Sequence, residues 1–245
     1  MSEALVRRVD SDGLTVLELN RPERLNALTS ALFRELAEHV TELETSTTIG
    51  CVVLRGANRC FSAGHDLDDI ASGDSKEHLQ FEARVVERLA LLPQPVIAAV
   101  EGHCYTGALE LALVADLIVA SRSARFADTH AKFALTPLWG MSQRLPRRVG
   151  QSRALEMMYT AATYSGEEAA RIGLANFVFP EDEFDAALDH LIRRILDNSW
   201  FSHAANKRLV RTADELPLTA GLAHEFFHSE GVGPDNAARL AAWKK

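Results

Sequence analysis

The strongest constraint on the fold of this chain is a series of short apolar segments separated by helical ones. "CVVL" at 51–54, "PVIAAV" at 95–100 and "LIVAS" at 117–121 show almost no polar alternation. Such strands are typical of a parallel sheet that is buried on both faces, because the crossover helices cover it. One helix, expected over 29–45, places five apolar residues on one face: Leu32, Phe33, Leu36, Val40 and Leu43. The pattern predicts an α/β fold.

The remaining segments divide the chain into two parts. A further strand is expected at 14–20, where Arg21-Pro22 ends it, and a last one lies in "ANFVF" at 175–179. Two more helices are expected at 75–92 and 107–115. Beyond about residue 180 only helices are expected, over 182–197, 200–212, 215–229 and 233–242. We therefore expect an α/β core over 1–180 and a helical region over 181–245.

Composition excludes several classes of protein. The 245 residues suffice for one large domain, and the net charge of −8, with no basic tract, argues against nucleic acid as a partner. No apolar run reaches the roughly 18 residues of a membrane span. Cys51, Cys60 and Cys104 have neither disulfide-framework nor zinc-site spacing, so we expect a reducing, cytoplasmic compartment and no metal.

Two glycine-containing stretches carry the chemistry. "CFSAGHDL" at 60–67 follows a buried strand, a position where loops of parallel sheets often bind ligands, although a simple tight turn fits equally well. In "GHCYTGALELALVADL", Gly107 opens a helix that carries Glu110 among apolar neighbours. A carboxylate in such surroundings is costly unless it is paired or used. Glu110 is therefore either a functional group or a locally paired one.

Five stretches together resemble one family. In this order and spacing, "RPERLNAL", "FSAGHDL", "AVEGHCYTGALELALVADLIVAS", "ARFADTHAKFALTPLWGMSQRLPRRVG" and "ANFVFP" are similar to the enoyl-CoA hydratase/isomerase family, the crotonase superfamily. The resemblance covers about residues 12–180. It implies a crotonase-like (ClpP/crotonase) fold, in which repeated ββα units form two roughly perpendicular sheets. It also implies a helical C-terminal region that packs between subunits of a homotrimer or a dimer of trimers.

The resemblance assigns roles to particular positions. Backbone N–H groups of His65 and Gly107 would form an oxyanion hole for the thioester oxygen of an acyl-CoA. Glu110 matches the first hydratase carboxylate, whereas the second carboxylate position holds His130, a departure from the family pattern. Coenzyme A is part of the substrate, so no separate cofactor is implied. The residues expected to bind CoA or substrate are Arg24, Leu25, Ala27, Ala63, His65, Asp66, Leu67, Asp68 and Trp139.

Several reactions fit these residues. Glu110 and His130 could act as base and acid in adding water to a 2-trans-enoyl-CoA, and their mutual attraction should favour the charged form of each. Glu110 alone could instead serve an isomerase, His130 could help in decarboxylation or hydrolysis, or the chain could bind acyl-CoA without catalysis. His130 could also position substrate or make a structural hydrogen bond. Asp128 could cap a turn or orient that imidazole, and Asp66 could stabilise a turn.

Overall fold

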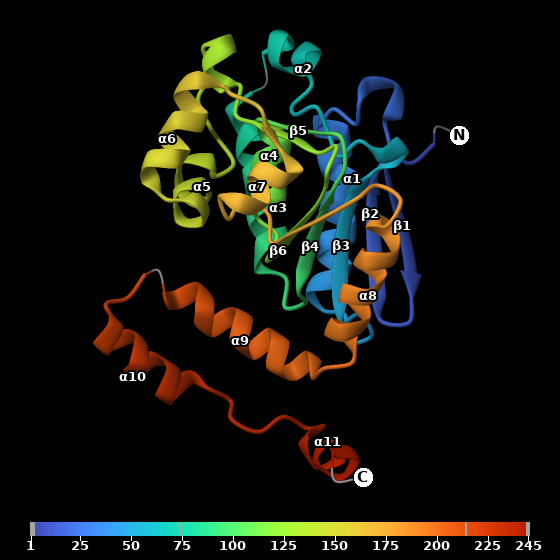
Figure 1. Cartoon of the computed structure of the whole chain (residues 1–245), viewed down its shortest axis with the longest axis vertical. Coiled ribbons are helices and arrows are strands. Elements are labelled where there is room, and N and C mark those ends of the chain that lie inside the picture. Colours follow the sequence, from blue (N-terminus) through green and yellow to red (C-terminus); the bar gives the residue numbers. More distant parts are fainter. Residues whose placement is uncertain (1–2, 74, 214, 244–245) are drawn as a thin grey trace.

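The computed structural model describes residues 3–73, 75–213 and 215–243 and contains two β-sheets (Figure 1). The larger sheet has the strand order β1-β2-β3-β4-β6-β9. Its strands are Val6–Ser11 (β1), Leu14–Leu19 (β2), Cys51–Gly56 (β3), Val96–Val100 (β4), Leu117–Ser121 (β6) and Phe177–Phe179 (β9). All neighbours from β2 to β9 are parallel, and only the β1–β2 pair is antiparallel. The expected parallel sheet is confirmed.

The smaller sheet consists of His103–Tyr105 (β5), Arg125–Ala127 (β7) and Tyr164–Ser165 (β8). Strands β5 and β7 follow β4 and β6 almost directly, so each long strand continues into a short one of the second sheet. An isolated bridge between Ser62 and Cys104 adds the stretch after β3 to this sheet. The two glycine-containing stretches therefore lie side by side.

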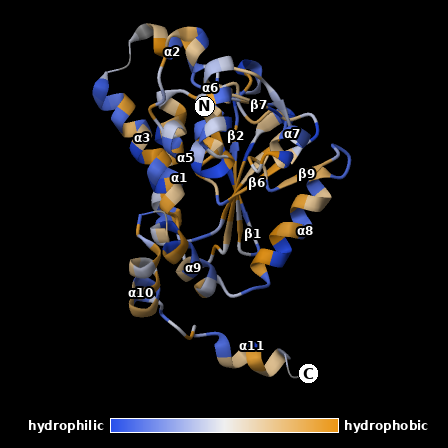
Figure 2. Cartoon of the chain, turned by 60° about the vertical axis from the view of Figure 1, so that its left-hand side comes forward, coloured by the Kyte–Doolittle hydropathy of each residue, from blue (hydrophilic) through white to orange (hydrophobic). Residues whose placement is uncertain are grey.

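Helices cover both faces of the larger sheet. On one face, Ser30–Glu44 (α1) and Lys76–Leu91 (α3) contribute their apolar sides to the main core. On the other face, Phe184–Leu196 (α8) packs Phe184, Leu188 and Ile192 against alternate residues of β3, β4 and β6. Figure 2 shows the apolar strands enclosed between these helices. Helix α8 lies beyond residue 180, yet it forms one layer of the sheet's covering.

Some helices differ from those expected. Met141–Val149 (α5) and Gln151–Thr160 (α6) were not predicted. Helix α5 contains Pro146, a residue that disfavours helix interiors, and Gly150, with φ of 81°, separates the two helices. The helix expected over 107–115 is shorter, Gly107–Ala112 (α4). The remaining short helices are Leu67–Ser72 (α2), Gly166–Arg171 (α7) and the 3₁₀ turns Pro22–Arg24 (η1), Ala57–Arg59 (η2) and His130–Phe133 (η3).

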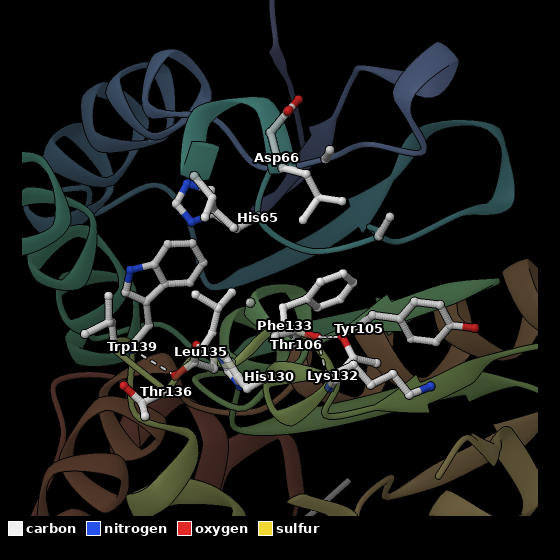
Figure 3. A pocket seen from close by; sticks show the side chains of 18 of the residues that line it. His65, Asp66, Tyr105, Thr106, His130, Lys132, Phe133, Leu135, Thr136 and Trp139 are labelled. Carbon is white, nitrogen blue, oxygen red and sulfur yellow. Dashed lines mark hydrogen bonds and ion pairs between the residues drawn. The ribbon is translucent and has the colours of Figure 1, made fainter. Parts of the chain in front are cut away.

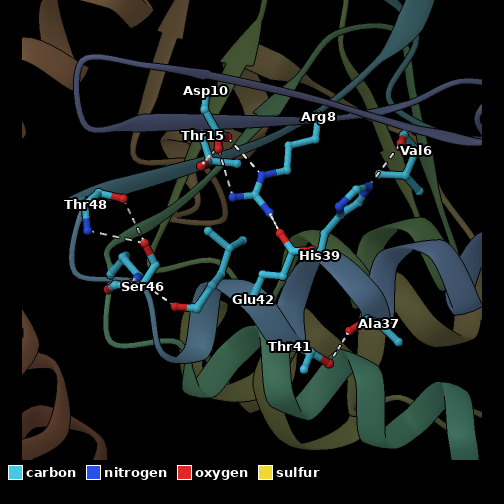
Figure 4. A network of polar contacts seen from close by, with 12 residues as sticks. Val6, Arg8, Asp10, Thr15, Ala37, His39, Thr41, Glu42, Ser46 and Thr48 are labelled. Atoms are coloured by element: carbon cyan, nitrogen blue, oxygen red, sulfur yellow. Dashed lines mark hydrogen bonds and ion pairs between the residues drawn. The ribbon is translucent and has the colours of Figure 1, made fainter.

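Polar contacts fasten the edge strand β1 to its neighbours (Figure 4). Arg8 donates to Asp10 at 2.9 Å and reaches Glu42 of α1 at 2.6 Å, while the Thr15 hydroxyl of β2 donates to Asp10 at 2.8 Å. His39 of α1 lies 3.3 Å from a backbone carbonyl of β1. Charged side chains on an exposed edge also oppose pairing with a foreign strand.

The C-terminal helices are Trp200–Ala213 (α9), Leu218–His228 (α10) and Asn236–Trp243 (α11), and α10 and α11 extend away from the sheets (Figure 1). Helix α9 is tied to the core, because the Lys207 ammonium pairs with Asp116 at 2.6 Å and donates to the Gln94 carbonyl at 2.9 Å. Large apolar side chains stay exposed on these helices and the segments between them: Val210, Leu218, Leu222, Phe226, Phe227, Val232, Leu240 and Trp243. In the described part of the chain, no helix is both long and apolar enough to cross a membrane.

Candidate active site

A cavity of about 750 Å³ opens where the stretch after β3, the start of α4, η3 and the turn before α5 meet (Figure 3). Every site residue expected from the sequence lines it except Leu25. Leu25 has φ of 50°, so its carbonyl accepts a hydrogen bond from the Ala63 N–H at 2.9 Å while its side chain is 47% exposed. Leu25 thus joins, through its backbone, the two loops that were expected to bind CoA.

The two expected oxyanion donors lie close together. A Cβ added to Gly107 would lie 3.3 Å from the His65 backbone nitrogen, so the two backbones are in near contact. Gly64 permits this approach, since it has φ of 105° and a Cβ there would lie 2.7 Å from the Tyr105 carbonyl oxygen. A Cβ at position 64 or 107 would be too close to neighbouring atoms, so the structure requires glycine at both positions.

Glu110 is almost completely buried, at 2% exposure, and points into the cavity from α4. Its Oε1 accepts hydrogen bonds from the Trp139 and Met141 N–H groups, each at 2.9 Å, and its Oε2 lies 3.7 Å from His130 Nε2. Burial raises the pKa of Glu110, and the Met141 hydrogen bond and the nearby imidazole only partly oppose this. The attraction to His130 lowers the pKa of Glu110, as expected, but burial outweighs it, so the expected net shift toward the charged carboxylate was wrong.

His130 is held by the residue two positions before it. Asp128 Oδ1 lies 2.6 Å from His130 Nδ1 and also accepts the His130 backbone N–H at 3.1 Å. Asp128 therefore both caps the turn and orients the ring, the two roles that the sequence left open. With Nδ1 directed at Asp128, the other ring nitrogen, Nε2, faces Glu110 and the cavity.

Asp66 and Arg24 are among the residues that line the cavity. The Asp66 carboxylate caps α2 by accepting from the Asp68 N–H and pairs with Arg21 at 2.9 Å. This confirms the turn-stabilising role. Arg24 lies 3.2 Å from Asp68, and both of these side chains are well exposed.

Thr106 and Glu82 are among the residues at or beside the site that the sequence did not indicate. Thr106 precedes Gly107 with φ of 52°, and its hydroxyl contacts the Thr129 hydroxyl and accepts the Thr129 N–H at 3.1 Å. No sequence signal indicates a β-branched residue at positive φ. Glu82 is fully buried on α3, 4.0 Å from the His65 ring. Glu82 lies three residues before Val85, on the apolar face of the helix. This spacing could have indicated from the sequence that Glu82 is buried.

The protein has two adjoining sheets, and the backbone nitrogens of His65 and Gly107 lie close together beside the buried Glu110 and His130. These features are typical of a crotonase-type α/β protein. The family model described as Enoyl-CoA hydratase/isomerase matches residues 10–230, so the chain belongs to this family and is an enzyme of it. Within the described residues, no group of three or more His, Cys, Asp or Glu side chains could hold a metal ion.

Known proteins of similar sequence and structure agree with this assignment. "Probable enoyl-CoA hydratase 1, peroxisomal" of Arabidopsis thaliana is 36% identical over 92% of this chain and 85% of its own length. The crystal structure of an enoyl-CoA hydratase from Bacillus anthracis has a TM-score of 0.93 at 31% identity, over 98% of this chain and 96% of the other. A Thermobifida fusca structure in complex with acetoacetyl-CoA has a TM-score of 0.86 at 27% identity, over 98% and 96% of the two chains.

Proposed function

We propose that this enzyme is an enoyl-CoA hydratase, a lyase that adds water across the C2–C3 double bond of a 2-trans-enoyl-CoA thioester. The observation that carries the proposal is the placement of Glu110 Oε2 and His130 Nε2, 3.7 Å apart in the cavity beside Gly107. Two titratable groups that face one small volume can share the two proton transfers of hydration. The names of the similar proteins support the same reaction.

The reaction follows from these positions. The N–H groups of His65 and Gly107 hold the thioester oxygen and stabilise the enolate that forms when water adds to C3. Ionised Glu110 accepts a proton from that water, while the imidazolium of His130 gives a proton to C2. The proton on Glu110 then passes to His130 across their contact, which restores both groups for the next turnover. Asp128 stabilises the imidazolium during this cycle.

Coenzyme A would enter at the mouth of the cavity. The residues of the two loops that we expect to bind CoA line the cavity: Arg24, Ala27, Ala63, Asp66, Leu67 and Asp68. The Thermobifida fusca structure contains acetoacetyl-CoA, which supports an acyl-CoA ligand. The proposed mechanism needs no metal or separate cofactor, because all proton transfers use Glu110, His130 and water.

We also propose a homotrimer, or a dimer of trimers, and a cytoplasmic location. The exposed apolar side chains of α9 to α11 would be covered by neighbouring copies, since a monomer rarely exposes so many large apolar residues in one region. The cytoplasmic location rests on the composition and on the three unpaired cysteines, all of them buried.

The function is tested with purified protein and crotonyl-CoA. Loss of the enoyl absorbance, with formation of the 3-hydroxy product, is expected for the wild type, and Glu110→Gln should reduce turnover by about 10²–10⁴-fold while CoA affinity changes little. Conversion of a 3-enoyl-CoA to its conjugated isomer without hydration would identify an isomerase. Tight binding of several acyl-CoAs without turnover would identify a binding protein.

A further inference from the structure

Trp139 lies between two cavities. The first is the candidate active site, and the second, of about 540 Å³, lies among α3, α5 and the segment around Arg211. Leu138 and Trp139 line both. Leu138 is half-exposed at the rim, whereas Trp139 is 4% exposed. The buried indole is therefore the side chain that separates the two volumes.

The indole is held in place on three sides. Its Cζ3 atom would lie 2.7 Å from a Cβ on Gly107, its ring packs on the His65 ring with centroids 5.1 Å apart, and it meets Phe33 edge-on at 4.9 Å. Figure 3 shows the indole beside the His65 ring. Its backbone N–H is also bound to Glu110. The ring cannot move aside without disturbing residues next to both proposed oxyanion donors.

The second cavity has a different lining. Glu87, Arg144, Arg147, Arg211 and Glu215 supply charged groups there, and Ala83 and Leu91 of α3 supply apolar ones. The indole edge opposite Gly107 carries Nε1, which has no hydrogen-bond partner among the described residues. Replacing Trp139 would therefore leave no hydrogen-bond partner unsatisfied.

We propose that Trp139 closes the inner end of the acyl pocket and restricts this enzyme to short acyl groups, an inference that rests on the proposed hydratase function. In the proposed complex, His65 and Gly107 hold the thioester carbonyl. The indole of Trp139 packs against both of these residues, so the acyl carbons that follow the carbonyl must extend past the indole. A tail of several more methylenes would meet this ring before it could reach the second cavity.

The test compares crotonyl-, hexenoyl- and decenoyl-CoA as substrates of wild type and Trp139→Ala. For the wild type, kcat/KM should fall from crotonyl- to decenoyl-CoA. In Trp139→Ala the ratio of decenoyl to crotonyl activity should rise at least tenfold, because each newly buried methylene contributes about fourfold. Equal losses at all chain lengths in the variant, or equal activity at all lengths in the wild type, would overturn the proposal.

Two further variants sharpen the test. Trp139→Phe keeps an aromatic ring against Phe33, so it should fold if Trp139→Ala does not, and it should raise hexenoyl activity relative to crotonyl activity. Ala83→Phe in the Trp139→Ala background refills the second cavity and should abolish the decenoyl gain. Persistence of that gain would show that the tail does not enter the second cavity.

Binding measurements separate failure of this proposal from failure of the hydratase assignment. Calorimetry with saturated butyryl- and decanoyl-CoA requires no turnover. The wild type should bind decanoyl-CoA no more tightly than butyryl-CoA, whereas Trp139→Ala should bind decanoyl-CoA at least tenfold more tightly than butyryl-CoA. If the wild type already shows this preference for decanoyl-CoA, Trp139 does not close the pocket, whatever the reaction.

Discussion

At the scale of single residues, burial and function oppose each other at Glu110. The carboxyl group is enclosed between α4 and the turn before α5, which raises its pKa, yet the proposed mechanism requires it to be ionised. Two backbone N–H groups and His130 Nε2 offset part of the cost. A base with a raised pKa is also a stronger proton acceptor. Burial of Glu110 therefore lowers the stability of the fold but strengthens Glu110 as the base of the proposed reaction.

Glu110→Gln should therefore stabilise the fold while it removes activity. A glutamine oxygen can still accept both N–H groups, and the buried charge is gone. The pKa of Glu110 is raised in the folded state, so the folded protein favours the protonated carboxyl. In the wild type this contribution to the free energy of unfolding is lost as the pH rises through the folded-state pKa. The gain in Tm, about 2–4 °C for about 1 kcal/mol in a chain of this size, should be larger at pH 7 than at pH 4, which is below the ordinary pKa of a glutamate. A lower Tm for the variant at pH 7 would contradict this, and Glu110→Ala, which leaves both N–H groups unpaired, is the destabilised control.

Asp128→Asn tests the orientation of the imidazole. The asparagine oxygen can still accept both the backbone N–H and Nδ1–H of His130, but without the negative charge it no longer stabilises the imidazolium. We expect kcat on crotonyl-CoA to fall by about 10²-fold or more, with KM little changed and the pH profile altered. His130→Ala should give a similar loss. Unchanged rates and pH profiles in both variants would mean that Glu110 acts alone.

At the scale of elements, the site depends on how closely α4 approaches the stretch after β3. Gly64 and Gly107 allow the two backbones to meet, and the Ser62–Cys104 bridge holds them together. Helix α5 contributes through its first residue, since the Met141 N–H binds Glu110. The site is thus built from backbone contacts between elements that lie far apart in sequence.

Gly107→Ala should disable the site without unfolding the chain. The new methyl group would lie 2.7 Å from the indole of Trp139 and 3.3 Å from the His65 nitrogen, where the thioester oxygen is proposed to bind. Turnover of crotonyl-CoA should fall by about 10²–10³-fold, the typical effect of losing one oxyanion donor. Gly221→Ala is the matched control, because a Cβ there meets nothing within 4 Å and activity should stay unchanged. Full activity in Gly107→Ala would exclude the proposed oxyanion hole.

At the scale of the whole molecule, the C-terminal helices divide into an anchored part and an extended part. Helix α8 covers the sheet, and Lys207 fastens α9 through Asp116. Beyond them, Phe226 is 80% exposed and Phe227 is 77% exposed on α10. This region adds little to the core of its own chain, so its apolar surface is explained best by the proposed assembly.

If the proposed trimer or hexamer forms, Phe226→Glu combined with Phe227→Glu should shift it to monomer, because charges placed in an apolar interface lose their hydration. Light scattering after size-exclusion chromatography measures the mass, and Glu225→Gln on the same helix should leave it unchanged. A wild type that is already monomeric at micromolar concentration would refute the assembly.

The sequence by itself determined the parallel sheet, its covering helices and the positions of Glu110 and His130. Apolar strands and helical spacing are local patterns, and the family resemblance supplied the residue roles. The sequence did not reveal α5, which contains Pro146, or α6, or the raised pKa of Glu110. Only the tertiary structure decided these points, together with the Asp128–His130 contact and the place of Trp139 between two cavities. The physical reason is that burial, charge environment and cavity shape depend on residues brought together from distant parts of the chain.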